Sequence, residues 1–511
     1  MPEVNRRALI VGSAGAVGLL ALGGLAGCSG TGSTVSATSE AVRRAEARRR
    51  KPNQNVVNAR LTAQETTLSL GGLVVQTWGY GDSLPGPLIR AQAGDFLRVK
   101  VDNKLSTRTS VHWHGIALRN DMDGVPGITQ DAIEPGSGFT YEFTAPDPGT
   151  YFYHPHSGVQ LDRGLYGVLV VDDPTEPGKY DEEWIVVLDD WVDGTGRTPD
   201  DVLEKLLSTG GSGDDSDGMG GIGGMDHGSM GGMGGMDMGA MSESMRSPLL
   251  GGAGDIDYPH YLVNGRTPGA PATLTAKPGQ RVRIRVINAG SDTAFRLALG
   301  GHQMTVTHSD GFPVEPVNTD ALLIGMGERY DVIVTLGDGA FPLVASAEGK
   351  KGQGMAVVRT GTGRTPAADV APPELNGRIV LSTDMTAAPD VRLPDRQVDK
   401  SHDLGLTGTM APYKWTINGK TFADAEPFPV NQGERVRLRF HNMSMMFHPM
   451  HVHGHTFGLV SGGARKDTVI VRPMQTVEVD LDADNPGQWA THCHNIYHAE
   501  AGMMTTLSYE N

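Results

Sequence analysis

One sequence unit occurs three times in this chain of 511 residues. The segment QAGDFLRVKVDN at residues 92–103 resembles KPGQRVRIRVIN at 277–288 and NQGERVRLRFHN at 431–442. Each copy joins a glycine turn to a run in which polar and apolar residues alternate, which is typical of a half-buried antiparallel strand. The repeat therefore predicts three units of similar structure.

A second repeat marks the end of each unit. GTYFYHPH begins at Gly149, GAFPLVAS at Gly339 and GQWATHCH at Gly487. The 70 glycines and the 6% aromatic content favour short strands and turns over long helices. We therefore predict an all-β protein of three Greek-key β-sandwich domains, with bounds near 52–181, 182–368 and 369–511.

The N-terminal segment predicts export. Arg6-Arg7 precede an apolar, glycine-rich run, and Leu25-Ala26-Gly27-Cys28 resembles a bacterial lipoprotein cleavage box. We expect a twin-arginine-like signal peptide at 1–27, lipidation at Cys28 and a solvated tether at 28–51. The protein would then be an exported, membrane-anchored lipoprotein of the bacterial envelope. A transmembrane anchor is the alternative, which the many glycines disfavour.

The formal net charge of −16 argues against nucleic acid as a partner. Phosphate binding draws on clustered lysine and arginine side chains, and this composition is acidic.

Histidines gather in four clusters. Residues two apart on a strand point to the same side, so each His-x-His pair directs two imidazoles toward one place. The middle unit has Val344 and Ser346 where the outer units have histidines, so we expect the first and third units to share the chemistry. The clusters hold ten of the 17 histidines: His112/His114, His154/His156, His448/His451/His453 and His492/His494/His498.

Cys493 lies between two of these histidines, in THCHNIYHAEAGMM. By strand alternation it points away from its neighbours, and so it serves a different site from them. A thiolate, two imidazoles and a long axial thioether make a blue copper electron-transfer centre, and Cys493, His448, His498 and Met503 supply this set. The other eight imidazoles could hold three further copper ions. Structural zinc is the rival, but such sites normally use paired cysteines.

Together these motifs resemble the multicopper oxidase family, three-domain cupredoxin-fold enzymes related to laccases and bacterial cuprous oxidases. HWHGIALRNDMDG and HPMHVHG are most similar to bacterial, especially actinobacterial, copper-resistance members. The resemblance implies an oxidoreductase with four copper ions that reduces O2 to water. By motif position it assigns His112 and His451 to the type 2 copper, and two sets to the type 3 pair: His114, His154 and His494, and His156, His453 and His492.

Reduction of O2 by four electrons also needs four protons, so carboxylates should lie near the copper cluster. Asp123 occupies the family position of the cluster acid. The family's second acid directly follows the blue-copper histidine, but here that residue is Ala499 and the carboxylate comes at Glu500. Either Glu500 substitutes or the proton route differs. For both acids, an ordinary surface carboxylate is the alternative.

Residues 218–245 of the middle unit form a glycine-rich insert with eight methionines. Thioether sulfur is a soft ligand that selects Cu(I), so we interpret the insert as a capture loop; a low-complexity linker is the alternative. Its candidate ligands are Met219, Met225, His227, Met230, Met233, Met236, Met238, Met241 and Met245.

The leading prediction is a monomeric envelope oxidase that converts Cu(I) to Cu(II) and serves copper tolerance. The run NMSMMF at 442–447 favours this substrate, with packing of Met443, Met445 and Met446 around the blue copper as the alternative. Against Cu(I), Ser444 stands where members specialised for this ion can carry an acid. Two alternatives remain. One is a laccase that oxidises phenolic or other aromatic reductants, and the other is a lipoprotein that buffers Cu(I) without turnover.

Overall fold

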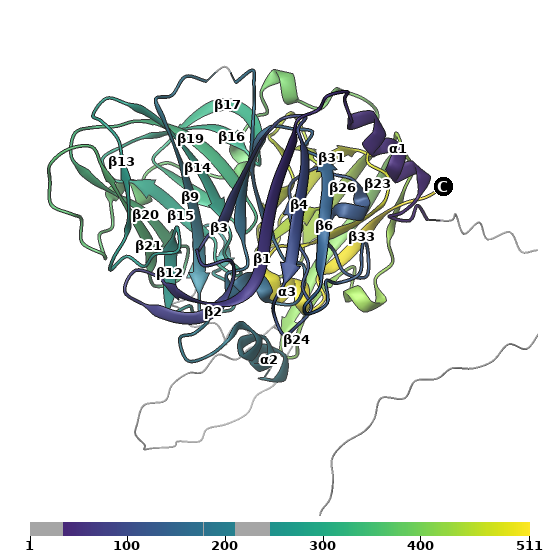
Figure 1. Cartoon of the computed structure of the whole chain (residues 1–511), viewed down its shortest axis with the longest axis horizontal. Helices are drawn as coiled ribbons and strands as arrows, with labels where there is room; N and C mark the ends of the chain where they lie inside the picture. Colours follow the sequence, from purple (N-terminus) through teal and green to yellow (C-terminus); the bar gives the residue numbers. More distant parts are fainter. Residues whose placement is uncertain (1–33, 177, 210–245) are drawn as a thin grey trace, which may run out of the picture. The chain divides into compact units, whose positions relative to one another are not determined.

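β-strands account for 47% of the structure and form paired sheets that repeat along the sequence (Figure 1). The computed structural model describes residues 34–176, 178–209 and 246–511. The signal peptide, Cys28 and the whole methionine-rich insert from Met219 to Met245 lie outside these residues and stay predictions. None of the described helices is long and apolar enough to cross a membrane.

The first unit consists of two four-stranded sheets, in the orders β2-β1-β4-β6 and β3-β8-β7-β5. A hydrophobic core around Trp113, Tyr141 and Leu169 fills the space between them. The strands are β1 (Val56–Ser69), β2 (Val74–Tyr80), β3 (Gly86–Gln92), β4 (Phe96–Asn103), β5 (His112–His114), β6 (Gly138–Thr144), β7 (Gly149–His154) and β8 (Gly167–Asp172).

The second unit has two six-stranded sheets, in the orders β12-β9-β14-β19-β16-β17 and β13-β21-β20-β15-β18-β22. Two short strands, β10 (Arg246–Ser247) and β11 (Gly251–Gly252), pair with each other. The others are β9 (Glu182–Trp191), β12 (His260–Val263), β13 (Ala272–Thr275), β14 (Arg281–Asn288), β15 (Phe295–Leu299), β16 (Met304–Ser309), β17 (Phe312–Thr319), β18 (Ala321–Ile324), β19 (Arg329–Thr335), β20 (Ala340–Ala347), β21 (Gln353–Arg359) and β22 (Ile379–Val380).

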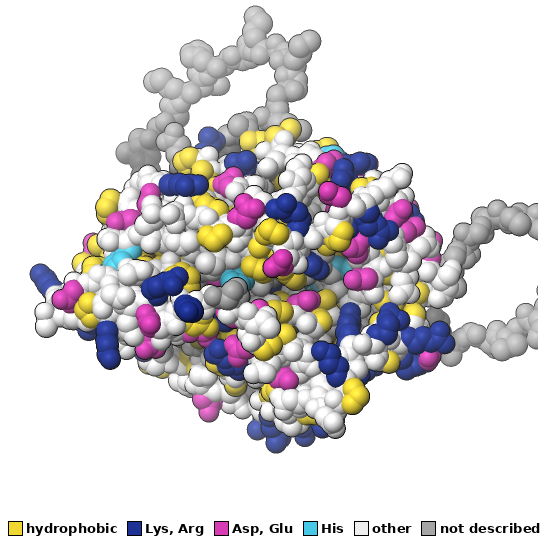
Figure 2. Space-filling model, turned by 90° about the horizontal axis from the view of Figure 1, so that it is seen from above, with side chains coloured by type: hydrophobic (Ala, Val, Ile, Leu, Met, Phe, Trp, Pro, Cys, Tyr) yellow, Lys and Arg dark blue, Asp and Glu magenta, His cyan; other side chains and the backbone are white. Residues whose placement is uncertain are grey.

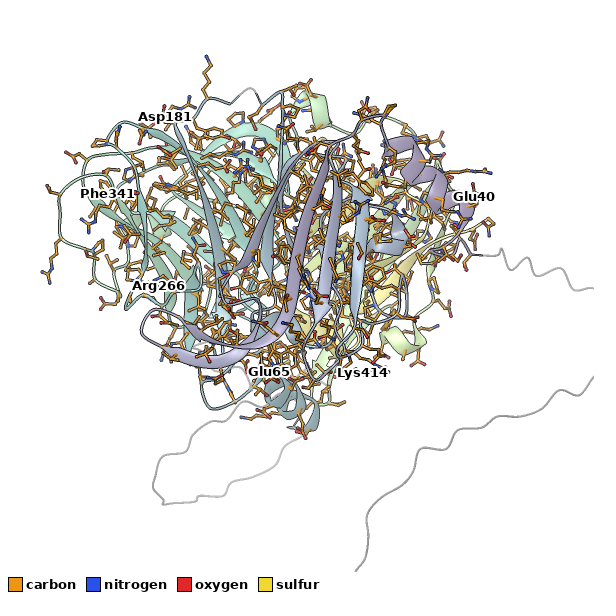
Figure 3. All side chains as sticks on the ribbon, viewed as in Figure 1. Glu40, Glu65, Asp181, Arg266, Phe341 and Lys414 are labelled. Carbon is orange, nitrogen blue, oxygen red and sulfur yellow. The ribbon has the colours of Figure 1, made fainter. Side chains whose placement is uncertain are left out.

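The third unit pairs a six-stranded sheet, β24-β23-β26-β31-β28-β29, with a five-stranded sheet, β25-β33-β32-β27-β30. Its strands are β23 (Lys400–Met410), β24 (Tyr413–Ile417), β25 (Phe428–Val430), β26 (Arg435–Asn442), β27 (His448–Val452), β28 (Phe457–Leu459), β29 (Arg465–Lys466), β30 (Thr468–Val471), β31 (Thr476–Asp482), β32 (Gln488–Cys493) and β33 (Met504–Tyr509). Side chains pack throughout the interiors of the sandwiches (Figure 3). The all-β prediction is confirmed.

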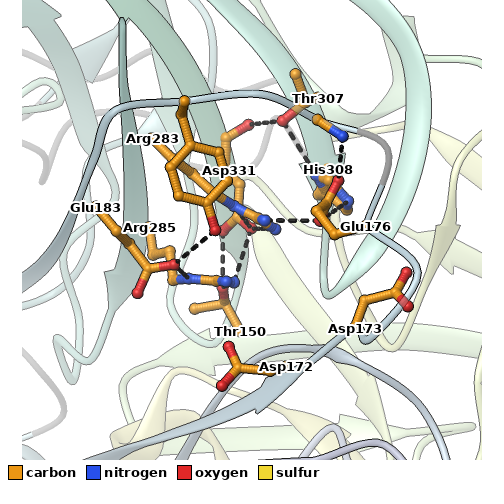
Figure 4. A network of polar contacts seen from close by, with 12 residues as sticks. Thr150, Asp172, Asp173, Glu176, Glu183, Arg283, Arg285, Thr307, His308 and Asp331 are labelled. Carbon is orange, nitrogen blue, oxygen red and sulfur yellow. Dashed lines mark hydrogen bonds and ion pairs between the residues drawn. The ribbon is translucent and has the colours of Figure 1, made fainter. Parts of the chain in front are cut away.

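The three repeated segments form equivalent central strands, β4, β14 and β26, but β14 has a different environment. β4 and β26 alternate between buried and more exposed residues, whereas β14 is buried from its second residue onward. Arg283 and Arg285 of β14 face Thr150 of the first unit and are neutralised by carboxylates of the second unit itself (Figure 4). Arg283 and Arg285 both bond to Asp331 Oδ2, at 2.5 and 3.1 Å, and Thr150 of β7 donates to Asp331 Oδ1 at 2.7 Å.

In the described part of the chain, α-helices are few and short: α1 (Glu40–Arg49), α2 (Pro199–Thr209) and α3 (Ile496–Glu500). On the face in Figure 2, basic and acidic side chains are interspersed. The prediction of a solvated tether at 28–51 does not hold for residues 34–50. Thr144 donates to the buried carboxylate of Glu46 from both its backbone and its hydroxyl, and Arg49 donates to Asn485. The basic run is part of helix α1, which is amphipathic. The prediction from the sequence took no account of its buried apolar side.

The boundary predicted at 368/369 lies too early. β22 pairs in parallel with β18, so residues 379–380 complete a sheet of the second unit. The strands of the third unit begin only at Lys400.

Candidate metal centre

Three side chains converge inside the third unit. Cys493 ends β32, His448 begins β27 and His498 lies on α3. Cys493 Sγ is 3.6 Å from Nδ1 of each histidine, and the two Nδ1 atoms are 3.1 Å apart. All three residues are buried. Met503 is buried as well, and its backbone bonds to both Cys493 and His498.

The donor atoms of this group suit a cation. His498 Nε2 donates to Asp255 Oδ2 at 2.8 Å, so its Nδ1 presents a lone pair to His448 and Cys493. Burial raises the pKa of the Cys493 thiol well above its ordinary range, so a positive charge is needed to hold the thiolate at neutral pH. One sulfur and two nitrogens in a triangle fit the trigonal part of a blue copper site.

Short-range hydrogen bonds hold the two imidazoles of this group. Asn495 caps α3 by accepting from the backbone N–H groups of Tyr497 and His498, which fixes the turn between Cys493 and His498. Ser444 Oγ lies 2.9 Å from His448 Nε2.

The remaining eight histidines meet between the first and third units. Antiparallel pairing sets His112 of β5 opposite His154 of β7, and His451 of β27 opposite His492 of β32. The structure brings donor atoms to within 4.8 Å of one another in three groups: His112, His114 and His451; His114, His154 and His494; and His156, His453 and His492.

Several ring nitrogens of this cluster are unprotonated, and their lone pairs face one another. Nδ1 of His112, His154 and His451 each donates to a backbone carbonyl at 2.9 Å, and the buried Nε2 atoms have no hydrogen-bond partner among the described residues. His453 and His492 also donate through Nδ1, so their Nε2 lone pairs face each other at 3.0 Å. Such an arrangement of lone pairs suits a cation between the nitrogens.

Electrostatics keep these rings in the metal-binding form. Burial, followed by the neighbouring imidazoles, holds the pKa values of six of them well below the ordinary range. They are therefore neutral near pH 7, with a free lone pair each. The six are His114, His154, His156, His453, His492 and His494.

The two predicted acids occupy different positions. Asp123 is fully buried; its Oδ2 accepts from His453 Nδ1 at 2.9 Å, and its Oδ1 lies 3.2 Å from His112 Nδ1. Glu500 is exposed. It borders a narrow cavity whose inner wall includes His154, His156, His492 and His494.

Sequence reasoning missed a second buried acid at the cluster. Asp467 Oδ1 lies 3.2 Å from His114 Nε2, and Arg329 of β19 holds both carboxylate oxygens at 2.7 Å. Burial alone would raise the pKa of Asp467, but Arg329 and the bonds from His114 and His451 outweigh burial and hold the pKa well below its usual range. The sequence gives little indication of this role for Asp467. Only strand pairing places the acid at the cluster, because the next residue, Thr468, lies opposite His451.

The surroundings of His498 were also missed. Asp255 Oδ2 accepts from His498 and from the Tyr413 hydroxyl, at 2.8 and 2.6 Å. The Trp415 ring covers His498 at a centroid distance of 4.0 Å. No exposed imidazole edge remains at this histidine. Asp255 follows the insert in the middle unit, far from any histidine motif, and no local pattern marks it.

Comparison with known proteins identifies the family. Three sequence profiles, each described as "Multicopper oxidase", match residues 62–176, 182–363 and 395–511. The chain belongs to the multicopper oxidase family. It is therefore an oxidoreductase of a family that binds four copper ions, one type 1, one type 2 and two type 3, as the resemblance implied.

Relatives of this multicopper oxidase include bacterial proteins of similar length. The chain is 51% identical to multicopper oxidase MmcO of Mycobacterium tuberculosis, over 92% of this chain and 90% of the relative. It is 32% identical to a copper resistance protein A homolog of Pseudomonas syringae pv. tomato, over 88% and 92%. A multi-copper oxidase from Pseudomonas thermotolerans of known structure aligns with a TM-score of 0.67 at 27% identity, over 89% and 100%.

Proposed function

We propose that this multicopper oxidase oxidises Cu(I) to Cu(II) outside the cytoplasm and thereby serves copper tolerance. Four Cu(I) ions give up four electrons, and O2 takes up these electrons with four protons to form two waters. The copper resistance protein among its relatives supports this role. The N-terminal export signal supports the location, and lipidation at Cys28 would anchor the protein there.

The ligand sets in this proposal follow the groups described above. Cys493, His448, His498 and Met503 would hold the type 1 copper. His112 and His451 would hold the type 2 copper, and the two type 3 ions would take His114, His154 and His494, and His156, His453 and His492. Copper bound in this way would supply a one-electron acceptor at the thiolate and a three-ion centre for the reduction of O2. Cys493, covalently joined to His492 and His494, would be the electron route between them.

The observation that carries the choice of substrate is the environment of His498. Asp255 Oδ2 is engaged by His498 and Tyr413, whereas its Oδ1 is buried with no hydrogen-bond partner in the described chain. An unpaired carboxylate oxygen favours a cation. A phenol would instead need to reach an imidazole edge, and Trp415 covers it. Asp255 therefore receives Cu(I) and conducts its electron to His498.

Protons reach the cluster through carboxylates in this proposal. Glu500 collects protons at the rim of the cavity that leads inward to His492 and His494. Asp123 acts inside the cluster, where its carboxylate already bonds to His453.

The test compares O2 consumption by the copper-loaded protein with Cu(I) and with a small phenol. We expect Cu(I) to give the higher kcat/KM. In Asp255→Asn protein, KM for Cu(I) should rise about tenfold, the effect of losing one charge contact. Asp257→Asn, which neutralises an exposed carboxylate two residues away, is the matched control and should behave as the unchanged protein.

Two results would contradict the proposal. Preference for the phenol would make the protein a laccase. Tight Cu(I) binding without O2 consumption would make it a copper buffer.

A further inference from the structure

A buried carboxylate of the second unit contacts both segments that fix the type 1 ligand His498. Asp292 lies between β14 and β15, and it is fully buried. Gly254 has a φ of 105°, and a Cβ there would clash with Asp292 Oδ2. The loop after β11 therefore needs glycine at this position to close on the carboxylate.

The first of these segments carries the partner of the His498 ring. The backbone N–H groups of Asp255 and Ile256 donate to the Asp292 carboxylate at 3.0 and 3.1 Å. Asp255 in turn accepts from His498 Nε2 through its Oδ2, at 2.8 Å. Asp292 thus fixes the backbone of the residue that orients the His498 ring.

The second segment carries the backbone of His498. Asn495 Nδ2 donates to Asp292 Oδ1 at 2.6 Å, and Asn495 Oδ1 accepts from the backbone N–H of His498 at 3.2 Å. One carboxylate therefore holds the His498 ring through Asp255 and the His498 backbone through Asn495.

Asp292 is itself held from the β9 side. Asp190 of β9 accepts from the backbone N–H groups of Ser291 and Asp292, at 2.7 and 3.1 Å. Both aspartates are fully buried. A side chain fixed at its backbone and at both carboxylate oxygens is a precise support for the groups that bond to it.

A lysine neutralises this carboxylate. Lys350 Nζ lies 2.6 Å from Asp292 Oδ2 and 2.9 Å from Thr293 Oγ, and the lysine side chain is fully buried. An ammonium group that has lost its hydration needs such a partner to stay charged. Charges interact over longer distances in the protein interior than in water, so this pair also acts on an ion bound by His498 and Cys493.

We propose that Asp292 is a positioning residue for the type 1 ligand His498, and that Lys350 raises the reduction potential of the type 1 copper by cancelling the carboxylate charge. This inference rests on the ligand set in the proposed function and is independent of the choice of Cu(I) as the reductant. An uncompensated carboxylate would stabilise Cu(II) over Cu(I), which has one positive charge fewer, and would lower the potential. Lys350 removes this effect and keeps the type 1 copper a good electron acceptor.

The first test separates charge from packing by the sign of the effect. In the full-length copper-loaded protein, Lys350→Met should lower the potential of the type 1 copper, and Asp292→Asn should raise it. Each change should alter the electron-exchange equilibrium with a redox mediator about tenfold, or about 59 mV for one electron. The double variant should lie close to the unchanged protein, because it restores a neutral pair. Redox titration of the blue band measures these potentials, and a shift of both single variants in the same direction would overturn the charge balance.

Two further variants control for loss of stability. Lys350→Arg keeps the positive charge and should keep the potential. Arg435→Met breaks a buried pair with Asp482 at the start of β26, and should lower stability without moving the potential. A shift in Arg435→Met protein as large as that in Lys350→Met protein would also overturn the charge balance.

The second test addresses the position of His498. Asp292→Ala removes the acceptor that both segments share, so the blue absorbance band should shift in wavelength. Asp320→Ala is the matched control, because Asp320 also accepts from a backbone N–H in the second unit, that of Arg378, and its loss should leave the band unchanged. An unshifted band in Asp292→Ala protein would overturn the positioning role.

The outcomes distinguish this inference from the proposed function. If the unchanged protein oxidises Cu(I) but its potential does not respond to Lys350→Met and Asp292→Asn, the inference fails and the proposed function stands. If the two potentials shift in opposite directions but Cu(I) is not oxidised, the proposed function fails and the inference stands.

Discussion

At the residue scale, Asp123 has two roles that the sequence did not distinguish: it orients histidine ligands and it can supply protons. Its position relative to His114 predicted an acid beside the cluster. The structure shows that its carboxylate also orients His453 through Nδ1, while its backbone carbonyl orients His112. A residue that fixes two ligands by two different atoms affects metal binding as well as proton supply.

We expect Asp123→Ala to lose type 2 and type 3 copper and to slow reoxidation by O2 about 10–100-fold, the usual effect of removing a partner of a ligand. Reduction of the type 1 copper should remain normal, because Cys493, His448 and His498 do not contact Asp123. Copper analysis and stopped-flow absorbance measure the two effects.

The control variant is Asp123→Asn, which keeps an oxygen atom to accept from His453. It should bind copper better than the alanine variant, while reoxidation by O2 stays slow. Rapid reoxidation in both variants would refute the proton role.

At the element scale, the turn from β32 into α3 sets the spacing of two type 1 ligands. Asn495 caps the helix, and its amide also donates to Asp292 of the second unit at 2.6 Å. Because α3 has only five residues, it depends on its cap and its packing more than on helix propensity. Asn495 therefore holds His498 against Cys493.

Asn495→Ala should lower the free energy of unfolding by about 1–2 kcal/mol, the cost of a lost N-cap. It should also shift the blue absorbance band, because His498 moves relative to Cys493. Denaturant unfolding and visible spectroscopy test this. Ser39→Ala removes the cap of α1, which accepts from Val42, and is the matched control. An unaltered blue band in Asn495→Ala protein would show that α3 is held by other contacts.

Strands made much of the site predictable. The period of a strand is fixed, so the spacing of His492, Cys493 and His494 is enough to predict two separate sites from the sequence. Helix α1 was missed because its basic residues obscured Val42 and Ala45, which pack on the body. Asp255 and Asp467 act through contacts to residues more than 200 and 130 positions away, at His498 and Arg329, and no local pattern encodes such contacts.

At the scale of the whole molecule, the second unit has no histidine pair, yet it joins the other two at the cluster. Arg329 is fully buried; it donates to the Thr150 carbonyl of the first unit at 3.0 Å and to Asp467 of the third at 2.7 Å. Gly115 has a φ of 85°, and a Cβ there would lie 2.4 Å from Arg329 Nη2. The first unit therefore keeps a glycine beside its histidine pair to admit an arginine from the second.

Arg329→Met should leave the Asp467 charge buried without its main partner, which costs roughly 3–5 kcal/mol for pairs of this kind. Because Asp467 contacts His114 and lies 3.4 Å from His451 Nδ1, the displaced carboxylate should disturb the histidine cluster and leave the type 1 group intact. Spectroscopy of the loaded variant should show a normal blue band and a reduced content of type 2 and type 3 copper. Arg296→Met breaks the Arg296–Glu348 pair inside the second unit and should lower stability without changing the ratio of copper types. Full occupancy of the cluster in Arg329→Met protein would mean that the second unit only supports the other two mechanically, and that the cluster is organised by the first and third units alone.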